Sequence, residues 1–193
     1  MNSEENRNHV LHALERVAAR CRDNRALILT ESDLKCQVYS ELLGEFGKIQ
    51  NTWEHDIRGI AIHTETKFFD NRGLLKQAPD IIITEPNRIS IRNRLDGNPV
   101  PSKGFHFDGS SILIELKFLK KDRAPHRIDL ANINADIMKG ETLNRRGDLD
   151  FHLIVAVFDR FSHGETPVSE VFLRNRRQQN LTCRYFAGGP TFR

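Results

Sequence analysis

Cysteine is scarce in this sequence, and the three cysteines present form no motif. Cys21, Cys36 and Cys183 are widely separated and include no C-x-x-C pair. An odd, sparse set argues against a disulfide framework, and its spacing argues against a structural zinc site. We expect three reduced, buried thiols.

Long hydrophobic runs are also lacking. The longest uninterrupted apolar stretch covers residues 153–158, whereas a membrane helix needs roughly 20 apolar residues. The first residues carry neither the basic flank nor the apolar segment of a secretory signal. We therefore expect a cytoplasmic protein with no membrane partner.

The residues that are present are typical of one globular domain. A chain of 193 residues, of which 38% are hydrophobic, can bury one core but is too short for two full-sized domains. The 29 Lys and Arg against 26 Asp and Glu give a net charge of +3. That balance permits nucleic-acid binding only where the cations gather on one face.

Hydrophobic periodicity predicts alternating helices and strands. Apolar residues spaced three and four apart predict helices over residues 3–22, 30–47 and 129–146. Period-two alternation or continuous apolar runs predict strands over residues 60–67, 77–84, 111–119 and 151–158. After Pro167 we expect a short helix to about residue 178 and a strand over residues 181–186. Residues 85–110 hold most of the turn-forming residues, with one small strand over 88–92. This order predicts a layered fold of the α/β or α+β class.

Two charged residues interrupt the apolar strand over residues 111–119. Residues two apart share one face of a strand, so Glu115 and Lys117 project together. Charges in so apolar a segment need a partner, hydration or a metal ion. The alternative is an ion pair that faces water on an edge strand.

Asp80 favours the metal-ion interpretation. It follows Pro79 at the start of the strand over residues 77–84, and Pro79-Asp80 is the only such dipeptide in the chain. Carboxylates on neighbouring strands are ligands that suit Mg²⁺. The alternative for Asp80 is a turn residue that caps its own backbone.

A third acid lies on the second predicted helix. A helical wheel puts Glu31 on the same face as Val38, the centre of the apolar stripe. An acid that points inward from the first turn needs a partner, although it could equally act by stabilising the positive end of the helix.

These residues together resemble the PD-(D/E)XK nuclease superfamily, which has the restriction-endonuclease-like fold. The resemblance rests on a helix with Glu31, a strand with Glu65, a strand with Pro79-Asp80 and a strand with Glu115-Leu116-Lys117, followed by a helix and a strand. It covers roughly residues 30–158. It implies an αβββαβ core with a central mixed sheet flanked by helices, within a single domain over residues 1–193. Residues 1–24 would be an accessory helix, 85–110 an insert and 159–193 a C-terminal extension.

The resemblance also implies a chemistry. Asp80 and Glu115 would bind Mg²⁺, with Mn²⁺ as a substitute, while Lys117 would position the attacking water and Glu31 would be an additional catalytic acid. Glu65 corresponds to a further acid of some members and ranks below Glu31. Asp136 and Lys139, on the following helix, could lie near the site, but a solvated helix face is the favoured expectation.

The implied function is a metal-dependent endonuclease that hydrolyses phosphodiester bonds, with DNA favoured over RNA, no nucleotide cofactor and a homodimer as one arrangement. Arginines are the candidates for contacting nucleic acid, although each cluster could be an ordinary solvated face: Arg145 and Arg146, and Arg174, Arg176 and Arg177. The alternative function is a catalytically inactive nuclease-fold module for nucleic-acid binding or assembly.

Overall fold

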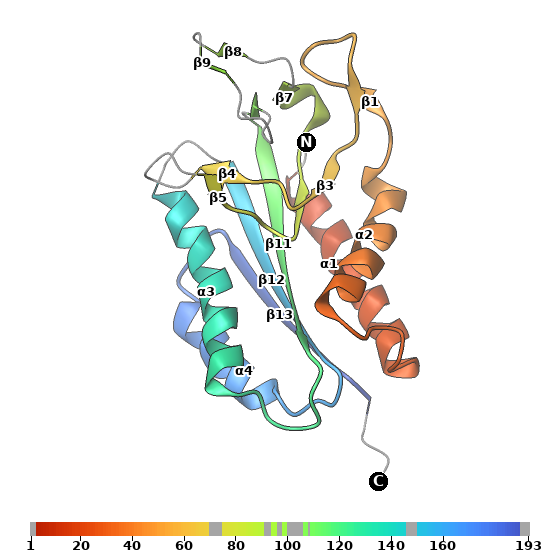
Figure 1. The fold of residues 1–193 in the computed structure, drawn as a ribbon, viewed down its shortest axis with the longest axis vertical. Coiled ribbons are helices and arrows are strands. Elements are labelled where there is room, and N and C mark those ends of the chain that lie inside the picture. The colour runs from red at the N-terminus through yellow and green to blue at the C-terminus, as the bar shows by residue number, and fades with distance from the viewer. Residues whose placement is uncertain are drawn as a thin grey trace.

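A computed structural model describes residues 3–69, 75–90, 94–95, 98–99, 106–107, 109–145 and 150–189. A five-stranded mixed sheet lies between two layers of helices (Figure 1). The α/β class predicted from periodicity is therefore confirmed.

The helices follow the predicted segments closely. They are α1 (Ser3–Asp23), α2 (Glu31–Phe46), α3 (Arg127–Asn144) and α4 (Glu165–Asn175). Thr30 caps α2 as its sequence indicates, because the Thr30 hydroxyl accepts from the Asp33 N–H (3.0 Å) and the Asp33 carboxylate accepts from the Thr30 N–H (3.0 Å). This capping box fixes the first turn of α2, which carries Glu31.

The main sheet has the strand order β13-β12-β11-β6-β3. Its strands are β3 (Ile62–Thr64), β6 (Ile81–Ile83), β11 (Ser110–Leu119), β12 (Asp150–Asp159) and β13 (Leu181–Ala187). The three long strands run parallel, whereas β6 is antiparallel to both of its neighbours. β3 and β6 are shorter than predicted. Glu65 adopts a positive φ of 53° directly after β3, which ends the extended conformation there.

The remaining strands form small two-stranded pairs at one end of the molecule. They are β1 (Gln50–Asn51) with β2 (Arg58–Gly59), β4 (Phe68–Phe69) with β5 (Leu75–Gln77), β7 (Ile89–Ser90) with β10 (His106–Phe107), and β8 (Arg94–Leu95) with β9 (Asn98–Pro99). A single 3₁₀ turn, η1 (Pro86–Arg88), precedes β7. The predicted insert thus begins directly after β6, and its residues 91–93, 96–97, 100–105 and 108 lie outside the described residues.

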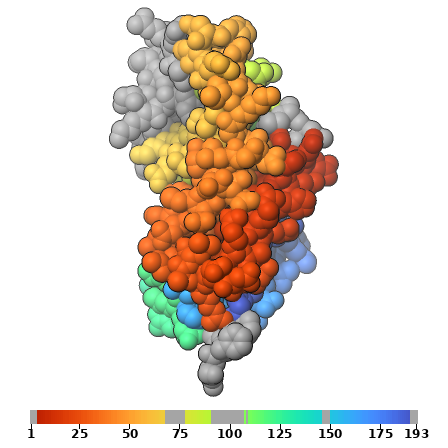
Figure 2. All heavy atoms as spheres, turned by 90° about the vertical axis from the view of Figure 1, so that its right-hand side faces the viewer, coloured from red at the N-terminus to blue at the C-terminus, as the bar shows by residue number. Residues whose placement is uncertain are grey.

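Each face of the sheet buries a separate apolar cluster. α1 and α2 cover one face, where Leu14, Leu42 and Ile114 are fully buried. α3 and α4 cover the other face, where Ile133 and Val155 are fully buried. Burying one such side chain contributes about 1.5–3 kcal/mol, so both clusters stabilise the sheet. Figure 2 shows that α1 and α2 form most of the surface on their side of the molecule.

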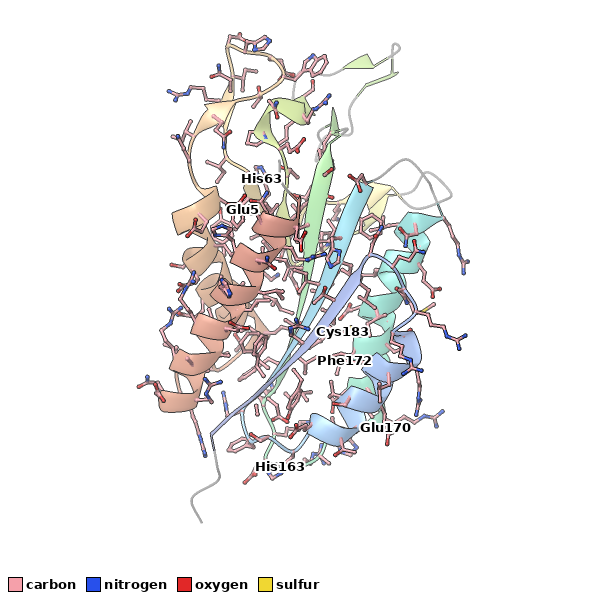
Figure 3. All side chains as sticks on the ribbon, turned by 180° about the vertical axis from the view of Figure 1, so that it is seen from behind. Glu5, His63, His163, Glu170, Phe172 and Cys183 are labelled. Carbon is pink, nitrogen blue, oxygen red and sulfur yellow. The ribbon has the colours of Figure 1, made fainter. Side chains whose placement is uncertain are left out.

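The two terminal segments belong to the same core. α1 supplies fully buried side chains to the first cluster, and β13 extends the parallel part of the sheet as its edge strand. Seen from behind, β13 crosses the front of the view between α1 and α4, with Cys183 on it (Figure 3). Cys21 and Cys183 are half-buried free thiols, but the prediction for Cys36 is wrong, because it lies on the exposed side of α2. Among the described residues, no helix is both long and apolar enough to span a membrane.

Candidate functional site

Three acids lie in one row across the sheet, next to the first residue of β6. Ile81, which begins β6, pairs with Ile114 of β11 and with Thr64 of β3. The neighbouring residue on the same side of each pair is an acid: Asp80 directly before β6, Glu115 on β11 and Glu65 directly after β3. The Glu65 N–H donates to the Asp80 carbonyl (3.2 Å). Sheet register therefore brings Asp80 and Glu115 to neighbouring positions.

Among the described residues, no strand pairs with this edge of β11 after Ile114, and carboxylates accept its backbone N–H groups instead. The Leu116 N–H donates to Asp80 Oδ2 (2.8 Å), and the Phe118 N–H donates to Glu31 Oε2 (3.4 Å). A carboxylate is a strong acceptor for a backbone N–H that no strand pairs. Asp80 thus caps the neighbouring strand rather than its own turn, and this contact fixes its carboxylate beside Glu115.

Glu115 is the most deeply buried acid of the site. It is 3% exposed, and its Oε1 lies 2.9 Å from Lys139 Nζ. Burial raises the pKa of Glu115 to about 8, the nearby Asp136 and Asp80 act in the same direction, and Lys139 opposes them. The carboxyl group therefore has less positive charge around it than its ionised form requires.

Lys117 contacts a helix on each side of the sheet, at the edge of β11 that no described strand covers. Its Nζ lies 3.3 Å from Glu31 Oε1 on α2 and 3.1 Å from Asp136 Oδ2 on α3. Burial alone would lower the pKa of Lys117, but Asp136 and Glu31 raise it above its usual value. Lys117 is thus held in its charged form, which can stabilise negative charge but cannot take up a proton.

α3 contributes two residues that the sequence reasoning set aside. Asp136 is 5% exposed, so the expected solvated position is wrong for this residue. Its Oδ1 lies 2.8 Å from Lys139 Nζ, while its Oδ2 accepts no hydrogen bond among the described residues, although Lys117 lies close enough for an ion pair. The sequence does indicate the buried position of Asp136, because this residue is three residues after Ile133 and four before Gly140, the spacings of one helix face.

α2 contributes a third lysine to the site, Lys35, which the sequence did not lead us to include. Lys35 Nζ lies 2.7 Å from Glu65 Oε1 and 3.1 Å from Asp80 Oδ1. Lys35 follows Glu31 by four residues, so both side chains leave the same face of α2. The acids directly after β3 and directly before β6 are therefore paired with this helix, whereas Glu115 is paired with α3.

Taken together, the site holds more negative than positive charge. It contains five carboxylates and three ammonium groups, so two negative charges are left when all are ionised: Glu31, Glu65, Asp80, Glu115 and Asp136 against Lys35, Lys117 and Lys139. No set of three or more Asp, Glu, His or Cys within the described residues is arranged to hold a metal ion. Mg²⁺, however, usually takes one or two carboxylates and completes its shell with water or substrate phosphate. Oxygen donors and an excess of acidic over basic groups fit such an ion.

The predicted nucleic-acid contacts lie apart from these acids. Arg145 and Arg174 are exposed near the C-terminal ends of α3 and α4, and each forms an ion pair with a glutamate of its own helix. Arg176 and Arg177 are also exposed, directly after α4, and Arg146 lies outside the described residues. None of the four described arginines contacts the acids of the site.

A further group of cations follows β11 directly. It comprises Lys120, Lys121 and Arg123 after β11 and Arg127 at the start of α3, which together we call the basic loop, and it begins three residues after Lys117. All four residues are exposed and form no ion pair within the described part of the chain. Sequence reasoning missed them because they are dispersed among other residues, whereas the arginines after α4 form a run.

In comparisons with known proteins, no protein-family model, no curated protein and no solved structure matches this chain. The resemblance to the PD-(D/E)XK superfamily therefore stays a prediction drawn from the residues.

Proposed function

We propose that this protein is a metal-dependent endonuclease that hydrolyses phosphodiester bonds, with DNA as the favoured substrate. Asp80 and Glu115 would hold Mg²⁺, or Mn²⁺ in its place. The observation that carries the proposal is the charge-rich array at the start of β6, where Asp80 and Glu115 are neighbours and Lys117 lies against Glu31 and Asp136. A bound divalent cation supplies a Lewis acid and lowers the pKa of water.

The lysines of the site have a separate role in this reaction. Nearby carboxylates raise the pKa of both Lys117 and Lys139 against the effect of burial, so both amines remain charged at neutral pH. Negative charge builds up on the phosphate oxygens as a nucleophile attacks, and preorganised ammonium groups stabilise it. Glu31 keeps Lys117 oriented, because the Lys117 ammonium group forms an ion pair with Glu31 on α2 and another with Asp136 on α3.

The basic loop provides a route for the substrate backbone. Exposed Lys and Arg side chains bind phosphates without regard to sequence and position the nucleic acid. The loop connects β11, which carries Glu115 and Lys117, to α3, which carries Asp136 and Lys139. A polynucleotide bound along it would pass beside the site, which supports a polymeric substrate over a small phosphoester.

Cleavage assays with matched variants test the proposal. Plasmid DNA and labelled DNA and RNA oligonucleotides would be incubated with Mg²⁺ or Mn²⁺ and with Asp80→Asn, Glu115→Gln or Glu41→Gln. The first two variants should lose about a hundredfold or more in rate, in keeping with the loss of one group that stabilises the transition state. Glu41→Gln is the control, because Glu41 pairs with Arg16 and Arg20 between α1 and α2, away from the site. Cutting at the parent rate by folded Asp80→Asn and Glu115→Gln would refute the proposal.

One observation favours the alternative, a nucleic-acid-binding module without turnover. Each of the five carboxylates already lies within ion-pair distance of a lysine, as expected of an array that needs no ion. This reading predicts DNA binding that weakens steeply with salt, with no cleavage of DNA or RNA in either metal.

A further inference from the structure

Lys139 lies between two buried carboxylates that come from different elements. Its Nζ is 2.9 Å from Glu115 Oε1 on β11 and 2.8 Å from Asp136 Oδ1 on α3. The side chains of Glu115 and Asp136 are 4% and 8% exposed, whereas that of Lys139 is 30% exposed. The amine can therefore reach solvent, while the two acids cannot.

The two acids depend on Lys139 to different degrees. Glu115 has no other ion-pair partner within the described residues, whereas Asp136 also lies 3.1 Å from Lys117 Nζ. A buried carboxylate needs a compensating charge to stay ionised. For Glu115, Lys139 supplies part of that charge, and a cation bound to the Glu115 carboxylate would supply it in place of Lys139.

Lysine suits a displaceable role better than arginine would. Its ammonium group is a point charge on a flexible stem of four methylene groups, so it can leave one partner without breaking a fixed two-point contact. Asp136 precedes Lys139 by three residues on the same helix. The Lys139 amine can thus leave Glu115 and keep its ion pair with Asp136, so that the ammonium group does not lose its charge partner.

We propose that Lys139 is a built-in counter-ion of Glu115, which a divalent cation displaces onto Asp136 alone. This inference rests on the proposed function, since it concerns the ion that Asp80 and Glu115 would hold. The amine and the divalent cation then compete for Glu115, and removal of the amine increases the affinity for the cation. Asp136 is a positioning residue in this arrangement, because it acts through Lys139.

Calorimetric titration with Mn²⁺, in the absence of nucleic acid, tests the competition. Lys139→Met keeps the stem but removes the charge, and it should bind Mn²⁺ more tightly than the parent by about 5- to 150-fold, the usual range for coupling between two ligands. Lys139→Arg keeps a charge beside Glu115 and should bind no more tightly than the parent. Lys121→Met is the control, because Lys121 is exposed on the basic loop and has no ion-pair partner within the described residues.

The outcomes separate this inference from the proposed function. Equal or weaker Mn²⁺ binding by Lys139→Met than by the parent overturns the competition but leaves the metal site in place. No binding by the parent or by Lys139→Met overturns the metal site and the competition together. If circular dichroism shows that Lys139→Met folds only when Mn²⁺ is present, the cation has replaced the missing amine, as we propose. If it does not fold even then, Lys139→Gln, whose amide can still donate to Asp136, decides the question by the same titration.

Discussion

Asp136 is the residue whose replacement tests the ion-pair array most directly. Asp136→Asn keeps the volume of the side chain but removes its charge, so Lys117 and Lys139 each lose one of their two carboxylate partners. A hydrogen bond to a charged group contributes about 1.5–3 kcal/mol, and breaking a buried ion pair costs about 3–5 kcal/mol. Because Lys117 keeps Glu31 and Lys139 keeps Glu115, we expect the free energy of unfolding to fall by about 3 kcal/mol.

Urea unfolding followed by circular dichroism measures this loss, with Asp129→Asn as the matched control. Asp129 lies on the same helix, and within the described residues its carboxylate accepts only from the His126 N–H at the start of α3 (2.8 Å). Losing such a capping contact costs typically about 1 kcal/mol. The loss for Asp136→Asn should also persist in high salt, which screens buried pairs much less than exposed ones. A loss no larger than that of Asp129→Asn would refute the view that Asp136 holds the two lysines.

Three further outcomes are expected. Tyr185→Phe should lower the free energy of unfolding by about 1.5–3 kcal/mol, because the Tyr185 hydroxyl donates to the buried Asp159 carboxylate (2.8 Å). Gly188→Ala should destabilise the fold by about 3 kcal/mol or more in the same urea assay, since the added Cβ would lie 2.0 Å from the Arg160 carbonyl oxygen. Burial lowers the pKa of His152 below its ordinary value of 6.5, so the unfolded chain takes up the proton first. Stability should therefore fall as the pH drops below about 6.5, and His152→Gln should reduce that fall. A fourth measurement concerns the basic loop: replacing its four cations by Gln should reduce the slope of log affinity for duplex DNA against log salt by about 3.6, and an unchanged slope would mean that DNA does not follow this loop.

The parts of the fold that the sequence predicts best are those with long periodic patterns. α1 from Val10 onward and α2 from Leu34 onward carry apolar residues at helical spacing, and β12 is buried at nearly every position. The short strands are predicted less well, because three paired residues contain too little alternation to mark where a strand ends. For β3, the end depends on the positive φ of Glu65, which the sequence does not indicate.

For the candidate site, strand geometry predicts more than helix geometry does. The period of two correctly puts Glu115 and Lys117 on one face of β11, where α3 provides the partners of both. The nearness of Asp80 to Glu115 could be expected only from strand order, and the capping of Leu116 by Asp80 depends on β6 beginning at Ile81. Such long-range contacts are fixed by register between segments far apart in the chain, and composition carries no record of register.

Asp136 and Lys139 show how an amphipathic pattern can mislead. Charged residues on a helix usually face water, and that general preference led to the solvated assignment. Ile133 and Ile137 nevertheless flank Asp136 on the buried face of α3. The acid is tolerated there because lysines from β11 and from its own helix compensate its charge.

Folding alone does not require charges at this position. Replacing a buried ion pair by apolar side chains of similar volume is often neutral or stabilising, by about 1–4 kcal/mol. Under α3, the neighbouring strand β12 contributes buried apolar side chains, among them Leu153 and Val155. Apolar side chains in place of Glu115 and Asp136 could extend this cluster. The array instead occupies the stretch beyond the first residue of β6, where no described strand pairs with this edge of β11 and its backbone N–H groups need carboxylate acceptors. Capping those two N–H groups accounts for Asp80 and Glu31, but it does not account for Glu115 or Asp136, which accept no backbone hydrogen bond within the described residues. These two carboxylates are the part of the array that a bound cation or a phosphate-binding role would explain.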